Sequence, residues 1–304
     1  MAYAMWDIGQ FAATVWRREF IQAFKNRQSL FTLFNVEPVA PGEAIAKIPL
    51  MGGMTANEFT PGAGKQVVLQ SGTMSSIALA MDQCFEASTL VDDFQALQTN
   101  VDHRAKMAKA MTECLFRKAD DKILSICGSY TGLPAGQQVA SETPVANPKS
   151  KADVATEIEN LVTEAQIVLD GTIGVGVGDR RIILPSRLFH NLLMGSDKQS
   201  PERPDIVFGA IQGKANPIGG AQPYNAESTS RSYDSYENVT SMKFYVFVPD
   251  AISFGLQSTP SLEVARMADY KSWFFSSDIL YGVKETLTAG FVECTLKAAG
   301  NVWA

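Results

Sequence analysis

The stretch NVDHRAKMAKAMTECLFRKADDKILSIC, residues 100–127, is the longest helical signal in the chain. Asn100 is a favourable N-cap residue, and Asp102 places a negative charge in the first turn, where the helix dipole favours it. No glycine or proline interrupts the run before Gly128, which suits a C-terminal stop. The stretch therefore predicts one uninterrupted helix, about 40 Å long at 1.5 Å per residue.

This predicted helix has an apolar stripe on one side and charges on the other. The apolar residues recur at three- and four-residue spacing, which is typical of a helix that packs along one face. The stripe consists of Val101, Ala105, Ala108, Thr112, Leu115, Phe116, Ala119, Ile123 and Ile126. Opposite charges four residues apart support the outer face, in the pairs Asp102 and Lys106, Lys109 and Glu113, and Arg117 and Asp121. Small residues on the stripe allow the helix to lie flat against a sheet.

Composition places limits on the class of protein. The chain has 304 residues, a 46% hydrophobic fraction and a formal charge of −6, which fits one large domain or two smaller ones and does not mark the whole chain as a nucleic-acid binder. The cysteines at 84, 114, 127 and 294 are scattered without CxxC spacing, so we expect reduced, buried thiols rather than a disulfide framework. We expect no signal peptide. The sequence has no run of about twenty apolar residues, so no membrane span is predicted.

The first 41 residues are expected to form an N-terminal arm. Residues 7–24 can make an amphipathic helix, followed by an apolar group around Phe31. A small basic cluster lies around the end of this helix and consists of Arg17, Arg18, Lys25 and Arg27. Two interpretations stay open: a terminal helix docked by its aromatic residues, or a mobile arm that reaches a neighbour or faces nucleic acid.

Residues 42–83 predict a long β-ribbon. Small and apolar residues alternate in GEAIAKIPL, a Gly- and Thr-rich segment follows, and KQVVLQSGTMSSIALAMDQ predicts one or two further strands. A two-stranded ribbon has too little core to be stable alone in water, so it must pack on something, such as another subunit. The sequence Ala63-Gly64-Lys65 lacks the spacing of a phosphate-binding loop, so we do not expect one.

The rest of the chain alternates helices and strands. We predict helices over 88–97, 150–169 and 185–195, and a turn-rich surface loop over 128–150. The glycine-dense segment 171–178 follows a helix and precedes a strand, which is the wrong order for a dinucleotide loop and indicates a connector. Predicted strands cover 180–184, two fragments within 213–228, and 242–248, 252–256, 262–267, 273–283 and 290–296.

No catalytic, cofactor-binding or metal-binding residues are predicted. The two histidines, His103 and His190, have no cysteine, histidine or carboxylate at metal-ligand spacing. The sequence contains no GxSxG motif, and nothing singles out a carboxylate pair for acid–base chemistry. This weighs against an enzyme, although a soluble α+β enzyme with an unrecognised site stays an alternative.

The order of these parts resembles the major capsid protein of tailed bacteriophages, whose shell fold is shared with herpesvirus capsid floors and encapsulins. The local likenesses are RRIILPSRLFHNLL (180–193), the glycine-broken GKANPIGGAQPY (213–224) and the closing WFFSSDILYGVKETLTAGFVECTL (273–296). The resemblance implies an α+β fold with a defined division. Its segments are an N-terminal arm (1–41), an extended β-ribbon loop (42–83), a peripheral domain with a spine helix (84–149), an axial domain (150–260) and return strands of the peripheral domain (261–304).

The resemblance also implies a structural function. Hexamers and pentamers of the chain would close into an icosahedral shell around double-stranded DNA, in a virion assembled in the host cytoplasm. Arg17, Arg18, Lys25 and Arg27 would be candidates for the inner, DNA-facing surface, and Glu58, Phe59 and Lys65 for contacts between subunits through the ribbon. Lys65 is also a conceivable donor for the Lys–Asn cross-link of some members, but no acceptor is indicated.

Further partners follow from the same resemblance. Residues 1–40 are too short for the cleavable scaffolding segment of some members, which implies a separate scaffolding protein or prior removal of that segment. A portal is implied, decoration proteins are left open, and no membrane is expected. The main alternative is an encapsulin-type compartment, which has the same fold but encloses an enzyme cargo.

Overall fold

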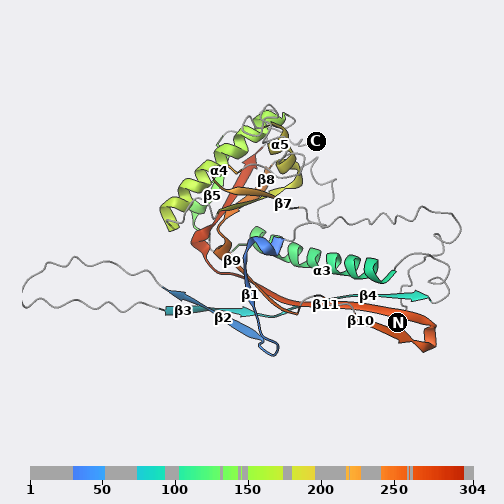
Figure 1. Cartoon of the computed structure of the whole chain (residues 1–304). Helices are drawn as coiled ribbons and strands as arrows, with labels where there is room; N and C mark the ends of the chain where they lie inside the picture. Colours follow the sequence, from blue (N-terminus) through green and yellow to red (C-terminus); the bar gives the residue numbers. More distant parts are fainter. Residues whose placement is uncertain are drawn as a thin grey trace, which may run out of the picture.

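The structure is a computed structural model, and it describes residues 30–51, 74–92, 103–130, 133–142, 145, 150–173, 180–195, 217–218, 220–226, 241–258, 260 and 263–297. These residues form two five-stranded sheets, three α-helices and a two-stranded ribbon. Figure 1 shows one helix lying along the first sheet, two helices packed on the second sheet, and the ribbon extending away from both.

The first sheet is built around β11 (Ser272–Glu285), the longest strand. Its strand order is β1 (Asn35–Pro38), β9 (Ile252–Ser258), β11 and β10 (Glu263–Met267), and β4 (Gln83–Asp92) pairs with the other edge of β11. All pairs are antiparallel except β1 with β9. β9 and β10 therefore lie one after the other along the same edge of β11.

The helix α3 (His103–Gly128) packs along β11 and confirms the long helix predicted for residues 100–127. Leu115, Ala119 and Ile123 of the predicted stripe are buried, with relative exposures of 0–2%. The Tyr281 hydroxyl donates a hydrogen bond to the Lys118 carbonyl at 3.2 Å, so Tyr281 lies on the face of the sheet that α3 covers. Before β1, the turn η1 (Leu30–Leu33) docks on α3, and the Leu30 amide donates to Asp120 Oδ1 at 2.8 Å.

The second sheet has the order β5 (Gln138–Ala140), β12 (Phe291–Lys297), β8 (Ser241–Phe247), β6 (Arg181–Pro185) and β7 (Gln222–Ala226). The helices α4 (Lys151–Ile173) and α5 (Ser186–Gly195) cover one face. Successive residues of a strand point to opposite faces. Phe244 and Val246 of β8 accordingly belong to the α4 core, whereas Tyr245 and Phe247 join the core under α3.

Short 3-10 helices connect several of these elements. They are η1 (Leu30–Leu33), η2 (Ala135–Gln137), η6 (Pro249–Ala251), η7 (Ala268–Tyr270) and η8 (Thr288–Gly290). The predicted helix over 150–169 and the predicted strands after residue 240 are confirmed, with small shifts of their ends.

Two expectations about secondary structure need correction. The helix predicted over 88–97 is wrong for residues 88–92, which continue β4 because each of them pairs with β11 and Leu90 and Val91 are buried. The turn-rich loop contributes a strand, β5, which pairs in parallel with β12. The two sheets share strands from both sides of residue 260, because β9 precedes it in the α3 sheet and β12 follows it in the α4 sheet, and the domain boundary expected there stays a prediction.

Candidate functional site

An exposed feature of the described chain is the ribbon of β2 (Ile45–Met51) and β3 (Met74–Ala80). The two strands pair antiparallel from Ile45 opposite Ala80 to Met51 opposite Met74. Ile45 is 56% exposed and Met74 is 73% exposed, while Leu79 is fully buried at the base. Figure 1 shows the ribbon pointing to the left, in the direction opposite to the end of the first sheet where β10 lies. An isolated ribbon is marginal in water, so these exposed apolar side chains indicate a contact surface.

The base of the ribbon is tied to the first sheet. The Gln257 side chain of β9 donates hydrogen bonds to the Ala40 carbonyl at 2.8 Å and the Glu43 carbonyl at 3.1 Å. These carbonyls belong to the turn between β1 and β2, where Gly42 has a φ of +94° that favours glycine. The Met81 amide donates to the Ala44 carbonyl at 3.0 Å and extends the ribbon's ladder by one bond. Nothing in the sequence marks Gln257 for this role, and the sequence analysis missed it.

The site residues predicted from the sequence lie outside the described residues. This holds for the ribbon candidates Glu58, Phe59 and Lys65, and for the basic candidates Arg17, Arg18, Lys25 and Arg27. Both groups stay predictions.

The face of the first sheet opposite α3 carries acidic side chains. Glu86 of β4 and Asp278 of β11 are exposed and lie directly opposite each other in the ladder. Like charges in this position are about 5 Å apart at Cβ and are unfavourable for the sheet. This part of the face does not suit a polyanion such as nucleic acid.

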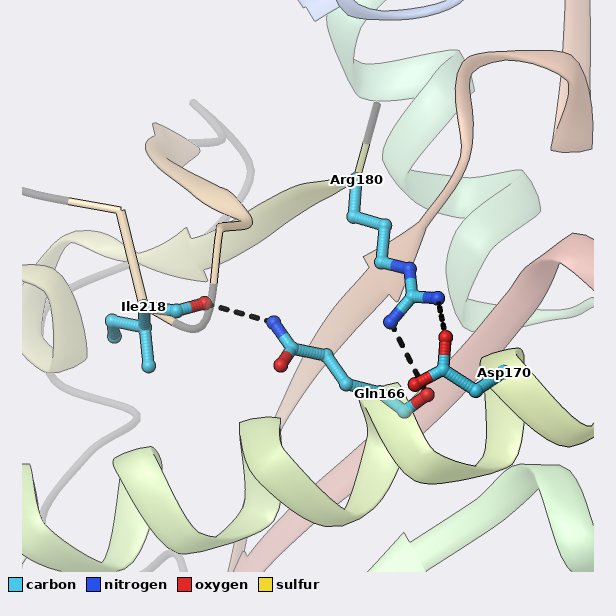
Figure 2. Close-up of polar contacts among 4 residues, drawn as sticks. All are labelled: Gln166, Asp170, Arg180 and Ile218. Atoms are coloured by element: carbon cyan, nitrogen blue, oxygen red, sulfur yellow. Dashed lines mark hydrogen bonds and ion pairs between the residues drawn. The ribbon is translucent and has the colours of Figure 1, made fainter. Parts of the chain in front are cut away.

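The buried polar cluster in Figure 2 is the part of the described chain that most resembles a reactive site. The Arg180 side chain is 0% exposed and forms an ion pair with Asp170, which is 58% exposed. Arg180 also donates to the backbone carbonyl of Gln166 at 3.2 Å. The side-chain amide of Gln166 in turn donates to the backbone carbonyl of Ile218 at 2.8 Å. The cluster joins α4 to the start of β6 and to the turn before β7. Its one carboxylate, that of Asp170, is paired with Arg180, and the contacts of the cluster fit a structural role.

The cysteines and histidines show no arrangement for catalysis where the structure describes them. Cys127 and Cys294 are buried, and burial raises the pKa of both thiols far above the usual range, so they stay protonated and unreactive. Cys84 and Cys114 are exposed free thiols, which corrects the expectation that all four are buried. His190 is exposed on α5. Among the described side chains, no three His, Cys, Asp or Glu residues gather in a way that could hold a metal ion.

No helix within the described ranges is long and apolar enough to cross a membrane.

A family model described as phage capsid protein matches residues 19–297 of the chain. No curated protein sequence matches it.

Solved structures with a similar fold come from phage capsids. A chain of Mycobacterium phage Che8 is 18% identical, with a TM-score of 0.64, and the match covers 92% of this chain and 96% of that one. A chain from the capsid of the cyanophage P-SCSP1u is 17% identical, with a TM-score of 0.66 and coverage of 94% and 93%. A chain from the mature capsid of bacteriophage PhiM1 is 15% identical, with a TM-score of 0.65 and coverage of 93% and 91%. At these identities the likeness shows the fold alone.

Proposed function

The chain belongs to the family of phage capsid proteins, and from that premise we propose that its copies assemble as hexamers and pentamers into an icosahedral shell enclosing double-stranded DNA. The family is a structural class of proteins, and the fold is that of tailed-phage capsid proteins. The finer steps proposed here are the oligomeric form, the enclosed DNA and the surfaces that make the contacts.

The ribbon is the observation that carries this proposal. Its described strands pair only with each other, and it exposes Ile45 and Met74 to solvent. We infer that a neighbouring subunit covers these side chains, and that the tip residues Glu58, Phe59 and Lys65 make contacts there. Each such contact can be individually weak, because a closed shell makes many contacts at once.

The two sheets support a proposed division of the chain. We assign the sheet covered by α3 to the peripheral domain, with α3 as its spine helix, and the sheet covered by α4 and α5 to the axial domain, whose tips would meet at five-fold and six-fold centres. Relative to the division expected from the sequence, β9 moves to the peripheral sheet and β12 to the axial sheet, because their hydrogen-bonded neighbours lie there.

Charge supports an orientation for the shell. The acidic pair Glu86 and Asp278 lies on the face opposite α3, and phosphates would be repelled there. We therefore assign that face to the outside and the basic arm residues Arg17, Arg18, Lys25 and Arg27 to the DNA-facing side. Binding of this kind would be non-specific and would weaken with salt. A separate scaffolding protein and a portal complete the proposed assembly in the host cytoplasm.

Particle size tests the proposal directly. The full chain would be expressed alone and with a phage scaffolding protein, then studied by light scattering and negative-stain microscopy. Closed particles, or capsomers of five and six subunits, are the expected result, and a monodisperse monomer under both conditions would overturn it. DNA enclosure requires its own readout: filled particles should protect double-stranded DNA from nuclease, whereas a peptide-tagged enzyme inside would indicate an encapsulin-type compartment.

A further inference from the structure

Two glycines face each other at the point where the ribbon joins the first sheet. Gly255 of β9 and Gly282 of β11 are directly paired, and both are buried. Their neighbour Tyr281 points to the α3 side, so by alternation Gly282 presents its bare Cα to the opposite face. A Cβ atom added at Gly282 would lie 2.1 Å from the Ala80 carbonyl oxygen. The last residue of β3 therefore rests on this glycine without room for a methyl group.

Gly255 has a similar but softer environment. An added Cβ would lie 2.4 Å from Met81 Cε and 2.9 Å from Leu79 Cδ2, which are both ends of flexible side chains. The described glycines with positive φ are Gly42 and Gly220, so neither Gly255 nor Gly282 is required for an unusual backbone conformation. Their function is to permit close approach.

We propose that Gly255 and Gly282 form a glycine seat that sets the direction in which the ribbon leaves the subunit. The seat supports the β3 side of the base, while Gln257 holds the turn that leads into β2. With both strands held at their inner ends, the direction of the ribbon is determined within each subunit. This inference rests on the proposed function, because the seat then sets the geometry of contact between copies.

Close approach at this seat has a measurable consequence. Real Cβ atoms essentially never come within 3.0 Å of such neighbours, so an alanine at 282 must displace the backbone at Ala80. An alanine at 255 can be accommodated when the side chains of Met81 and, by a smaller amount, Leu79 move. An added Cβ at 282 would also lie 2.9 Å from Met81 Cε, but the contact with the Ala80 backbone remains whatever side chain stands at 81. The two substitutions should therefore differ in severity, and shortening the side chain at 81 should relieve only the milder one. A general loss of packing would not produce this specific dependence.

Hydrogen exchange on unassembled subunits tests the seat. Gly282→Ala should speed exchange of the Met81 amide at least about tenfold, while amides of α4 keep their wild-type rates. Gly255→Ala should give a smaller acceleration, which Met81→Ala reduces in the double variant. Met81→Ala should not rescue Gly282→Ala. The matched control is Gly136→Ala, because an added Cβ there meets no atom within 4 Å.

Assembly provides the second readout. Gly282→Ala should abolish closed particles or change their diameter, and Gly136→Ala should leave both unchanged. Wild-type exchange at Met81 in Gly282→Ala, rescue of that variant by Met81→Ala, or shells of normal diameter from a subunit with accelerated exchange would each overturn the inference. If Gly282→Ala does not fold, the Gly255→Ala and Met81→Ala comparison decides. Failure of the wild-type chain to assemble would refute the proposed function alone, because exchange is measured on single subunits.

Discussion

Substitution of Asp170 tests how the α4 side of the subunit is held together. Its carboxylate pairs with Arg180, whose side chain is 0% exposed, so Asp170→Asn removes a negative charge from beside a buried guanidinium. Breaking a fully buried ion pair in this way costs about 3–5 kcal/mol. Because Asp170 itself is 58% exposed, water screens part of the interaction, and we expect a loss of about 2 kcal/mol.

The converse substitution should be milder. Arg180→Met removes the buried charge itself and keeps most of the side-chain length, so its cost is that of lost hydrogen bonds, about 1 kcal/mol for the one to the Gln166 carbonyl. The double variant should be no less stable than Arg180→Met, because the exposed Asp170 carboxylate needs no partner. The free energy of unfolding would be measured by urea denaturation of unassembled subunits, with the exposed Asp250→Asn as a control. An Asp170→Asn variant as stable as the wild type, beside a larger loss in Arg180→Met, would refute this reasoning.

Three further expectations concern α3, the ribbon base and pH. Ile123→Ala in α3 should lower the free energy of unfolding by about 2–5 kcal/mol, because Ile123 is 0% exposed. The control Ser125→Ala, at an exposed position, should change it by under about 0.5 kcal/mol. Equal effects in urea denaturation would contradict the packing of α3 on the first sheet. Gln257→Ala should lower the free energy of unfolding by about 1 kcal/mol and speed hydrogen exchange of the Glu43 amide, which donates to the Ala40 carbonyl in the β1–β2 turn. Unchanged exchange would argue against the role of Gln257 in holding this turn. Burial raises the pKa of the Cys127 and Cys294 thiols in the folded protein. Below about pH 8.5 these thiols are protonated in both the folded and the unfolded protein, so they do not change the free energy of unfolding. Above that pH only the unfolded thiols ionise, and the free energy of unfolding falls by about 1.4 kcal/mol per pH unit for each thiol. Cys294→Ala should reduce this alkaline slope in denaturation measured from pH 7 to 10, and an unchanged slope would contradict the assignment.

Local pattern was sufficient for the long helices. The stripe of α3 and that of α4 recur at helical spacing over many turns, and glycine or polar residues mark their ends. Such signals depend only on residues close in sequence, so no knowledge of the rest of the fold is needed. The order of ribbon, long helix, second helix and closing strands was readable for the same reason, and it led to the phage capsid family.

Residues 88–92 show where local pattern fails. Ser88 or Thr89 followed by two acidic residues is typical of a helix start, and this favoured a helix. In the structure β11 offers a continuous ladder to these residues, and burial of Leu90 and Val91 adds to it. Helix propensities differ by less than about 1 kcal/mol per residue, so pairing with a distant strand outweighs them.

The sequence alone was enough for the class of fold, the main helices and the expectation of a shell protein, because these depend on periodicity, on turn residues and on the order of segments. Three features could be seen only in the folded chain. They are the glycine seat, the hydrogen bonds by which Gln257 holds the β1–β2 turn, and the assignment of β9 to the α3 sheet and β12 to the α4 sheet. Gly282 and Ala80 lie about two hundred positions apart, and no spacing rule links residues at that separation. Their contact exists because β11, β9 and the ribbon base meet in space, and that meeting is settled by the packing of the whole subunit.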